Sequence, residues 1–253
     1  MQSTTSPARL MLIGSLALLV ACDGTTPTDN SPAGSPELAR SVLAPSLPSA
    51  GDFVARVTNP YFPLIRGTVF TYRSETDEGV ETNTVEVTDR TKTILGIVAT
   101  VVHDRVYLDG ELTEDTDDWY AQDRWGNVWY LGEHSCEIED GECVSTEGSW
   151  EAGVDGAEAG IIMWAQPGAN RGKTYRQEYS AGVAEDMAKV LRLNSRVEVP
   201  YGDFSGCLET MDFSALEPGV REHKFYCPGT GLVLEVEPRG GRTRAELVSI
   251  SRR

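Results

Sequence analysis

From residue 52 onward, apolar and polar residues alternate in short runs instead of recurring at the spacing of an α-helix. Runs rich in Val, Thr, Tyr and Ile occupy 67–75, 96–110, 220–238 and 242–251, with turn residues between them. Such runs are typical of β-strands. We predict roughly ten strands with little helix, which indicates an all-β fold made as a single antiparallel meander. A meander of this length curls into a half-barrel or a closed barrel.

One segment, 181–193 ("AGVAEDMAKVLRL"), has a pattern that also fits a helix. Val183, Met187, Val190 and Leu191 would share one helical face. We expect a short turn followed by a strand here. The acidic run at 109–118 holds six carboxylates, and calcium binding by them is one reading. The favoured reading is a surface charge run on an edge strand, which discourages aggregation between sheets.

The densest aromatic segment is 118–133 ("DWYAQDRWGNVWYLGE"). Asp123-Arg124-Trp125-Gly126 predicts a type I turn in which Gly126 adopts a left-handed conformation, so the segment forms a hairpin. The resulting register pairs Gln122 with Val128, Ala121 with Trp129, Tyr120 with Tyr130, and Trp119 with Leu131.

The two faces of this hairpin are expected to differ. Trp119, Ala121, Trp129 and Leu131 form a core face, whereas the face with Val128 is mixed and suited to line a groove. We therefore take Tyr120, Gln122 and Tyr130 as candidate ligand-binding residues. Trp125 joins them because packing at a turn tip does not require an indole.

The N-terminal segment is expected to be a targeting signal. Arg9 precedes an apolar run from Leu10 to Val20, which is shorter than the roughly 20 residues that span a bilayer. Leu19-Val20-Ala21-Cys22 resembles the lipobox of bacterial lipoproteins, which are cleaved before a cysteine that is then acylated. An ordinary signal peptide with a chance cysteine is the alternative reading. The resemblance implies that 1–21 is a signal peptide and that Cys22 anchors the chain to a membrane.

This anchor predicts a place in the cell envelope, on the extracytoplasmic face, and Asp23 does not decide between inner and outer membrane. Residues 22–51 are rich in Pro, Ser, Thr, Gly and Ala without apolar periodicity, so they are expected to be a flexible linker. Residues 52–253 are expected to form one antiparallel β domain.

The net charge limits the classes of binding partner, and the cysteine content indicates disulfide bonds. The chain has 22 Lys and Arg against 39 Asp and Glu, a net charge of −17, which excludes nucleic acid as a partner. Beyond Cys22, four cysteines remain, as expected for disulfides in an exported protein. We predict that Cys136 pairs with Cys143 around an Asp140-Gly141 turn, and that Cys207 pairs with Cys227. A zinc site of the four thiolates is disfavoured because CxxC spacing is missing.

Several segments resemble signature segments of a family of secreted bacterial proteins, from residue 59 to near the C-terminus. They are "NPYFPLIRGTVFTY", "DWYAQDRWGNVWYLGE", "GSWEAGVDGAEAGIIM" and "YRQEYSAGVAED". That family has no established activity, so the resemblance implies no catalytic residues.

Motifs of known chemistry give little. The run 168–174 ("GANRGKT") has one residue too few between its glycines for a phosphate-binding loop and leads into a strand. His103, His134 and His223 are far apart in sequence, so no metal site is predicted, and no cofactor is implied. With 39 acids in the chain, paired carboxylates for glycoside hydrolysis are easy to nominate; the nominees are Glu178, Glu185, Asp186, Glu217 and Glu222.

Three functions remain open. The favoured one is a non-enzymatic, membrane-anchored module that binds an amphiphilic or small ligand on a concave face. The alternatives are an extracytoplasmic hydrolase that uses carboxylates, and a structural or interaction lipoprotein. An apolar cavity would favour the first, a polar cleft with clustered acids the second, and a filled barrel the third.

Overall fold

The computed structural model describes residues 42–237 and 243–253. The predicted signal peptide, Cys22 and most of the linker lie outside them. The described part is all-β, with no α-helix and two 3-10 turns, η1 (Ala50–Asp52) and η2 (Pro167–Asn170). The strands are β1 (Val42–Leu43), β2 (Phe53–Val54), β3 (Thr68–Glu75), β4 (Val80–Ile94), β5 (Ile97–Leu108), β6 (Glu111–Asp123), β7 (Val128–Glu139), β8 (Glu142–Ser145), β9 (Trp150–Glu151), β10 (Glu158–Met163), β11 (Thr174–Arg176), β12 (Glu178–Tyr179), β13 (Asp186–Val199), β14 (Gly202–Ser214), β15 (Glu222–Cys227), β16 (Gly231–Val236) and β17 (Arg244–Arg252).

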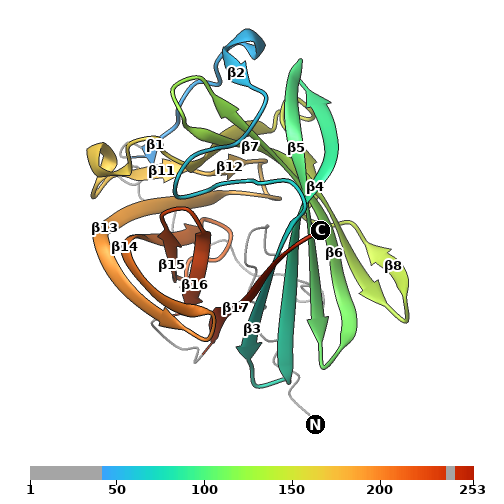
Figure 1. Ribbon diagram of the computed structural model, residues 1–253. Helices are drawn as coiled ribbons and strands as arrows, with labels where there is room; N and C mark the ends of the chain where they lie inside the picture. The colour runs from blue at the N-terminus through green and yellow to red at the C-terminus, as the bar shows by residue number, and fades with distance from the viewer. Residues whose placement is uncertain (1–41, 238–242) are drawn as a thin grey trace, which may run out of the picture.

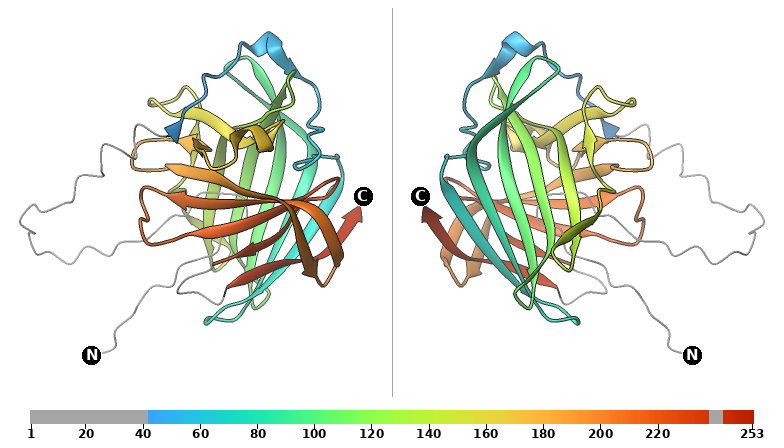
Figure 2. Two further views of the ribbon diagram at one scale, coloured as in Figure 1. Left: turned by 90° about the vertical axis from the view of Figure 1, so that its left-hand side faces the viewer. Right: turned by 90° about the vertical axis from the view of Figure 1, so that its right-hand side faces the viewer.

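All of these strands belong to one sheet that curls into a half-barrel (Figure 1). Consecutive antiparallel hairpins join β3 to β7 and β13 to β17, and β17 pairs with β3, so the two runs are continuous. They form two walls that face each other, with the β13–β16 strands crossing the β4–β7 strands steeply (Figure 2). Short strands connect the far ends of the walls, because β10 pairs with β7 and β12, and β11 pairs with β13.

The all-β meander expected from the sequence is confirmed. Eleven strands have six or more residues, close to the number expected, and the other six are short. The segment at 181–193 is a turn that leads into strand β13, as predicted. The predicted pairings of the cysteines are also present, Cys136 with Cys143 and Cys207 with Cys227. Disulfides are typical of proteins outside the cytoplasm.

The β6–β7 hairpin follows the predicted register only near its turn. Gly126 has φ +93°, and the pairs Gln122–Val128, Ala121–Trp129 and Tyr120–Tyr130 are present. The predicted pair of Trp119 with Leu131 is wrong, because the register shifts and Asp118 pairs with Glu133.

This shift is a β-bulge that changes which side chains of β7 face the inside of the half-barrel. Without it, Gly132 and His134 would share a face with Tyr130; with it, Glu133 and Ser135 do so and are buried. Gly132 has φ +133° and packs against the backbone of Trp150, where a Cβ would clash. The bulge therefore depends on glycine and turns a carboxylate inward.

The acidic run at 109–118 is not at an edge of the sheet. Strand β6 pairs with β5 on one side and with β7 on the other, so the edge-strand prediction is wrong. Its alternate residues point into the half-barrel, where Thr116 and Asp118 are buried. A run of acids that looks like a solvated face is partly an interior lining.

At the N-terminal end, part of the segment expected to be a linker is placed against the domain. Val42 and Leu43 pair in parallel with Thr174 and Tyr175 of β11. Phe53 of β2 then lies edge-on to Trp129, with ring centroids 6.5 Å apart. Within 42–237 and 243–253, no helix has the length and apolar character that crossing a bilayer would require.

Candidate functional site

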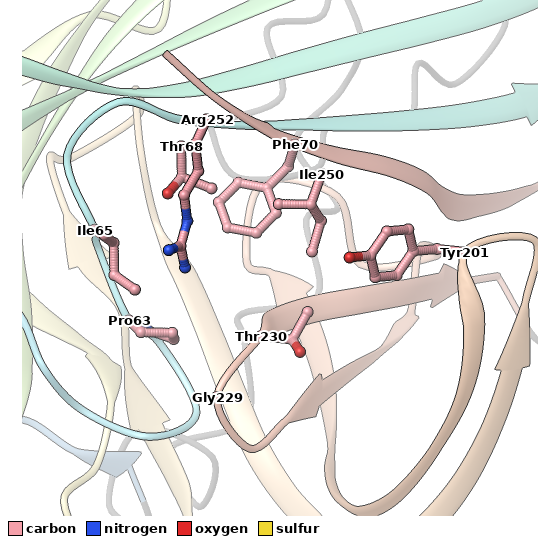
Figure 3. Close-up of a pocket in the computed structure, with 9 residues that line it drawn as sticks. All are labelled: Pro63, Ile65, Thr68, Phe70, Tyr201, Gly229, Thr230, Ile250 and Arg252. Atoms are coloured by element: carbon pink, nitrogen blue, oxygen red, sulfur yellow. The ribbon is translucent and has the colours of Figure 1, made fainter.

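A pocket of about 360 Å³ opens at the rim of the half-barrel (Figure 3). We call it the rim pocket. It is formed by the first residues of β3, the last residues of β17, the β13–β14 turn, the β15–β16 turn and the loop before β3. Its volume is within the range of pockets for small ligands, about 300–1,000 Å³. The residues that line it are Pro63, Ile65, Thr68, Phe70, Tyr201, Gly229, Thr230, Ile250 and Arg252.

Strand pairing fixes the wall of this pocket. Ile250 of β17 lies opposite Phe70 of β3, and Arg252 lies opposite Thr68. A register shift between Leu247 and Ser249 sets this arrangement. Because of the shift, Leu247 and Ile250 lie opposite Tyr72 and Phe70, whose side chains point inward.

The turns and the loop are tied to the same frame by backbone hydrogen bonds. Gly229 donates to the carbonyl of Pro60 at 2.7 Å, and Tyr201 donates to the carbonyl of Leu247 at 3.1 Å. Gln122 holds the start of the loop, since its Oε1 accepts hydrogen bonds from the amides of Thr58 and Asn59 at 2.7 and 2.8 Å. The pocket is therefore held together by two backbone hydrogen bonds and by the Gln122 side chain.

Polar and apolar surface contribute to the lining in similar amounts. Ile65 and Tyr201 are large side chains that remain 48% and 46% exposed. Figure 3 shows the guanidinium of Arg252 directed into the pocket, between Thr68 and Pro63. The Thr68 hydroxyl is buried and has no hydrogen-bond partner in the structure.

Below the rim pocket lies a small apolar cavity of about 30 Å³. The two share Pro63, Phe70 and Thr230. The cavity is lined from the inside of the half-barrel by the residues Tyr72, Val85, Val87, Val102 and Tyr120, among others. Its size is enough for about one water molecule or a methyl group. The apolar lining of the rim pocket thus continues into the core.

The four sequence-predicted binding residues fall in different places. Tyr120 is buried, lines the small cavity, and stacks on Tyr130 with ring centroids 4.8 Å apart. Gln122 is used to hold the 58–59 backbone. Trp125 is 55% exposed at the turn tip, beneath the guanidinium of Arg124. These four do not share one pocket, and ligand binding by any of them stays a prediction.

Deeper in the half-barrel, Tyr130 joins two carboxyl groups. Its hydroxyl lies 2.6 Å from Oδ1 of Asp118 and is also hydrogen-bonded to Oε2 of Glu133. A tyrosine hydroxyl can donate only one proton, so one of these carboxyl groups must be protonated to donate to the phenol oxygen. Burial raises the pKa of Asp118 well above its usual value, and the nearby Asp104 raises it further.

A second group of interior acids surrounds Lys224 of β15. Its ammonium lies 3.6 Å from Glu222, 3.6 Å from Glu235 and 3.8 Å from Asp212. Burial favours the neutral amine, but the carboxylates, led by Glu235, outweigh this effect and raise the pKa of Lys224. Burial also raises the pKa of Glu222 to about 7. One ammonium is thus surrounded by three acids, of which Glu235 is completely buried.

The carboxylates nominated for hydrolysis are partly brought together. Asp186 and Glu222 lie close enough to Lys224 and Asp212 to affect one another's pKa, and Asp186 raises the pKa of Glu217 after burial. Glu178 is elsewhere, near Asp118, and Glu185 accepts a hydrogen bond from the Gly182 amide. None of the five lines the rim pocket or the small cavity.

The histidines do not converge. His103 pairs with Asp115 at 2.8 Å, and His223 pairs with Glu209 at 3.1 Å. Among residues 42–237 and 243–253, no group of three or more His, Cys, Asp or Glu side chains is arranged to hold a metal ion.

The residues that line the rim pocket were missed at the sequence level. They come from five segments between Pro63 and Arg252, and no local spacing marks them. Arg252 itself gives no signal, because its strand also contains Arg244 and Glu246.

Comparison with known proteins adds no activity. No protein-family model and no curated protein matches the chain. Among solved structures, it is similar to a "putative lipoprotein" from Parabacteroides distasonis ATCC 8503, with a TM-score of 0.43 and 11% identity over 76% of this chain and 99% of that one. It is also similar to a β-barrel-like protein of a domain of unknown function from Brucella abortus, with a TM-score of 0.39 and 11% identity over 74% and 97% of the two chains.

Proposed function

We propose that this protein is a non-enzymatic binding module, tethered to a membrane through Cys22, that takes up a small or amphiphilic ligand in the rim pocket. The observation that carries the proposal is the pocket itself, about 360 Å³ with Phe70 and Ile250 in its wall. Ligand sites are typically concave and mostly apolar, with a few placed polar groups. The rim pocket is concave, and it combines apolar side chains with the polar groups of Arg252, Thr68 and Thr230.

The frame around the pocket supports binding without rearrangement. Its wall is one antiparallel strand pair, and backbone hydrogen bonds hold its turns. The buried disulfide between Cys207 and Cys227 fixes the β15 end of the turn that carries Thr230. A preformed site loses less conformational entropy when a ligand binds.

The hydrolase alternative has one observation in its favour. The pKa of Glu222, at about 7, suits a general acid. However, Lys224 and Asp212 surround this group, and it lies outside both the rim pocket and the small cavity. The binding module is the function that the geometry supports best.

The proposal is tested with a neutral, apolar fluorophore such as N-phenyl-1-naphthylamine and the full chain. The variant Ile250→Trp fills the pocket, and we expect its fluorescence enhancement to fall at least tenfold at equal concentration. Ser251→Trp is the matched control, since Ser251 is exposed on the same strand and lies opposite Val69. This control should bind like the wild type.

Thermal unfolding followed by circular dichroism checks that both variants fold. If Ile250→Trp does not fold, Thr230→Trp fills the pocket from the turn and replaces it. Equal binding by wild type and a folded pocket-filled variant would overturn the proposed site.

A further inference from the structure

We infer that the rim pocket selects organic anions, in which a carboxylate or similar oxyanion is joined to an apolar body. This inference rests on the proposed function and adds the charge of the ligand. It is carried by the placement of one arginine, one buried hydroxyl and no acid around an apolar wall.

The first observation is the state of Arg252. Its side chain forms no hydrogen bond or ion pair with any residue in 42–237 or 243–253, and it points into the pocket (Figure 3). The adjacent Arg253 behaves differently, because its Nη1 lies 3.4 Å from Oε2 of Glu86. In a chain with 39 acids and 22 basic residues, an arginine left without a partner beside a pocket is available for an anion.

The second observation is the Thr68 hydroxyl. Thr68 is 3% exposed, lines the pocket opposite Arg252 in the strand pair, and its Oγ1 has no partner. A buried hydroxyl without a hydrogen-bond partner destabilises the fold. A ligand oxygen that accepts a hydrogen bond from it would remove this cost, and the same oxygen could contact the guanidinium.

The third observation is the absence of negative charge in the lining. None of the residues of the rim pocket is an acid, although the interior below contains Glu235, Asp212 and Asp118, all buried. A cationic ligand would find no counter-charge in the pocket. A neutral apolar ligand would leave Arg252 and Thr68 unpaired.

The remaining lining defines the body of the ligand. Phe70 and Ile250 form the inner wall, while Ile65 and Tyr201 stand at the opening. The small cavity beyond Phe70 admits about one methyl group. A head at Arg252 and Thr68 with an alkyl or aryl body against Phe70 therefore fits an anionic amphiphile of modest length.

The experiment measures calorimetric affinities of the full chain for three probes with the same chain length: octanoate, octan-1-ol and octylammonium. Acetate is the anion without a body. We expect octanoate to bind about tenfold more tightly than octan-1-ol, the gain of one charge-assisted contact at a partly exposed site. Octylammonium and acetate should bind at least tenfold more weakly than octanoate.

Variants separate the head from the body. Arg252→Gln should remove the preference for octanoate over octan-1-ol, whereas Arg253→Gln, the matched control, should retain it. Thr68→Val should weaken octanoate about threefold without lowering the melting temperature. Added salt should reduce the preference in the wild type and not in Arg252→Gln.

The possible outcomes distinguish a failure of anion selection from a failure of the proposed binding function. If octanoate and octan-1-ol bind equally, or Arg252→Gln keeps the preference, anion selection is wrong while the pocket stands. If no probe binds the wild type and Ile250→Trp changes nothing, the proposed function itself fails. If acetate binds as tightly as octanoate, the apolar body has no part in recognition and the inference also fails.

Discussion

The apolar and the acidic halves of the half-barrel interior are built from the same strands. On β4, Val85 and Val87 line the cavity below the rim pocket, whereas Asn83 and Glu81, two and four residues before Val85, are buried near Asp104. On β6, Tyr120 lines the cavity and Asp118 is buried beside Glu133. The strands thus change chemistry along their length while keeping one side inward.

This difference shows which part of the interior stabilises the fold and which part lowers its stability. The apolar half gains free energy from burial, roughly 25 cal/mol per Å². The acidic half holds carboxyl groups that must be protonated or paired, which is costly unless the pairing is good. Binding surfaces are more easily built next to the first half than within the second.

The largest expected effect comes from removing the cation of the acidic half. Lys224→Met leaves Glu235, Glu222 and Asp212 without their ammonium, and it should reduce the free energy of unfolding by about 3–5 kcal/mol near neutral pH. Lys173→Met, at an exposed lysine that contacts only Asn170, is the control and should cost less than about 1 kcal/mol. Urea denaturation measures both. Equal effects of the two substitutions would show that the acidic half is solvated.

Much of the fold was predictable, because strand-forming residues and turn signals are local. The Asp123–Gly126 turn and the Asp140-Gly141 turn gave the hairpins, and the second also gave one disulfide. The register beyond Tyr120 was not predictable, because the bulge depends on Gly132 packing against Trp150. Trp150 lies eighteen positions further along the chain, and no local pattern marks this contact.

The interior acids and the rim pocket were not predictable for a different reason. A strand with alternate acids has the same pattern whether those acids face solvent or a barrel interior, so β6 was placed at an edge. Thr68, Tyr201 and Arg252 meet only after β17 pairs with β3 and the β13–β14 turn folds over them. The strand topology alone brings these residues together, so no local sequence pattern marks them.

The next effect concerns the two disulfides. Replacing Cys207 and Cys227 by alanine should cost about 3.3 kcal/mol, and replacing Cys136 and Cys143 about 2.5 kcal/mol, from the entropy of the loops that they close. Only the first pair adjoins the turn that carries Thr230, so only its loss should weaken fluorophore binding. Chemical denaturation and the fluorescence titration together check this. The account is contradicted if removal of Cys136–Cys143 weakens binding as much.

The acidic half should also give the protein an unusual dependence on pH. The pKa of Glu222 is raised to about 7 by burial, then by Asp212 and Asp186, against the lowering effect of Lys224. A pKa higher in the folded than in the unfolded state gives stability that is fully present below the unfolded value and is lost as pH rises through the folded one. The contribution of Glu222 to the free energy of unfolding should therefore fall by about 2–3 kcal/mol between pH 4.5 and 7.5.

Glu222→Gln tests this contribution, since the amide does not titrate. The free energy of unfolding of the variant should fall less than that of the wild type over the same pH range. Glu139→Gln, at an exposed position of β7, is the control and should follow the wild type. Parallel curves for Glu222→Gln and wild type would refute the contribution.

A smaller effect is expected at the junction of the two halves. Tyr130→Phe removes the hydroxyl between Asp118 and Glu133 and should cost about 1–2 kcal/mol. Tyr107→Phe, at a half-buried tyrosine of strand β5, should cost less than about 0.5 kcal/mol. Thermal unfolding measures both variants. If Tyr130→Phe is neutral, the carboxyl pair does not depend on this hydroxyl.

The central claim is that the ligand lies in the rim pocket, at the apolar end of the interior. Intermolecular nuclear Overhauser effects between octan-1-ol and the full chain locate the ligand directly. We predict nuclear Overhauser effects from the alkyl protons of octan-1-ol to the side chains of Phe70 and Ile250. In the variant Ile250→Trp, the effect to Phe70 should disappear. Effects confined to other exposed apolar side chains, such as Leu95 and Val98, would contradict the claim.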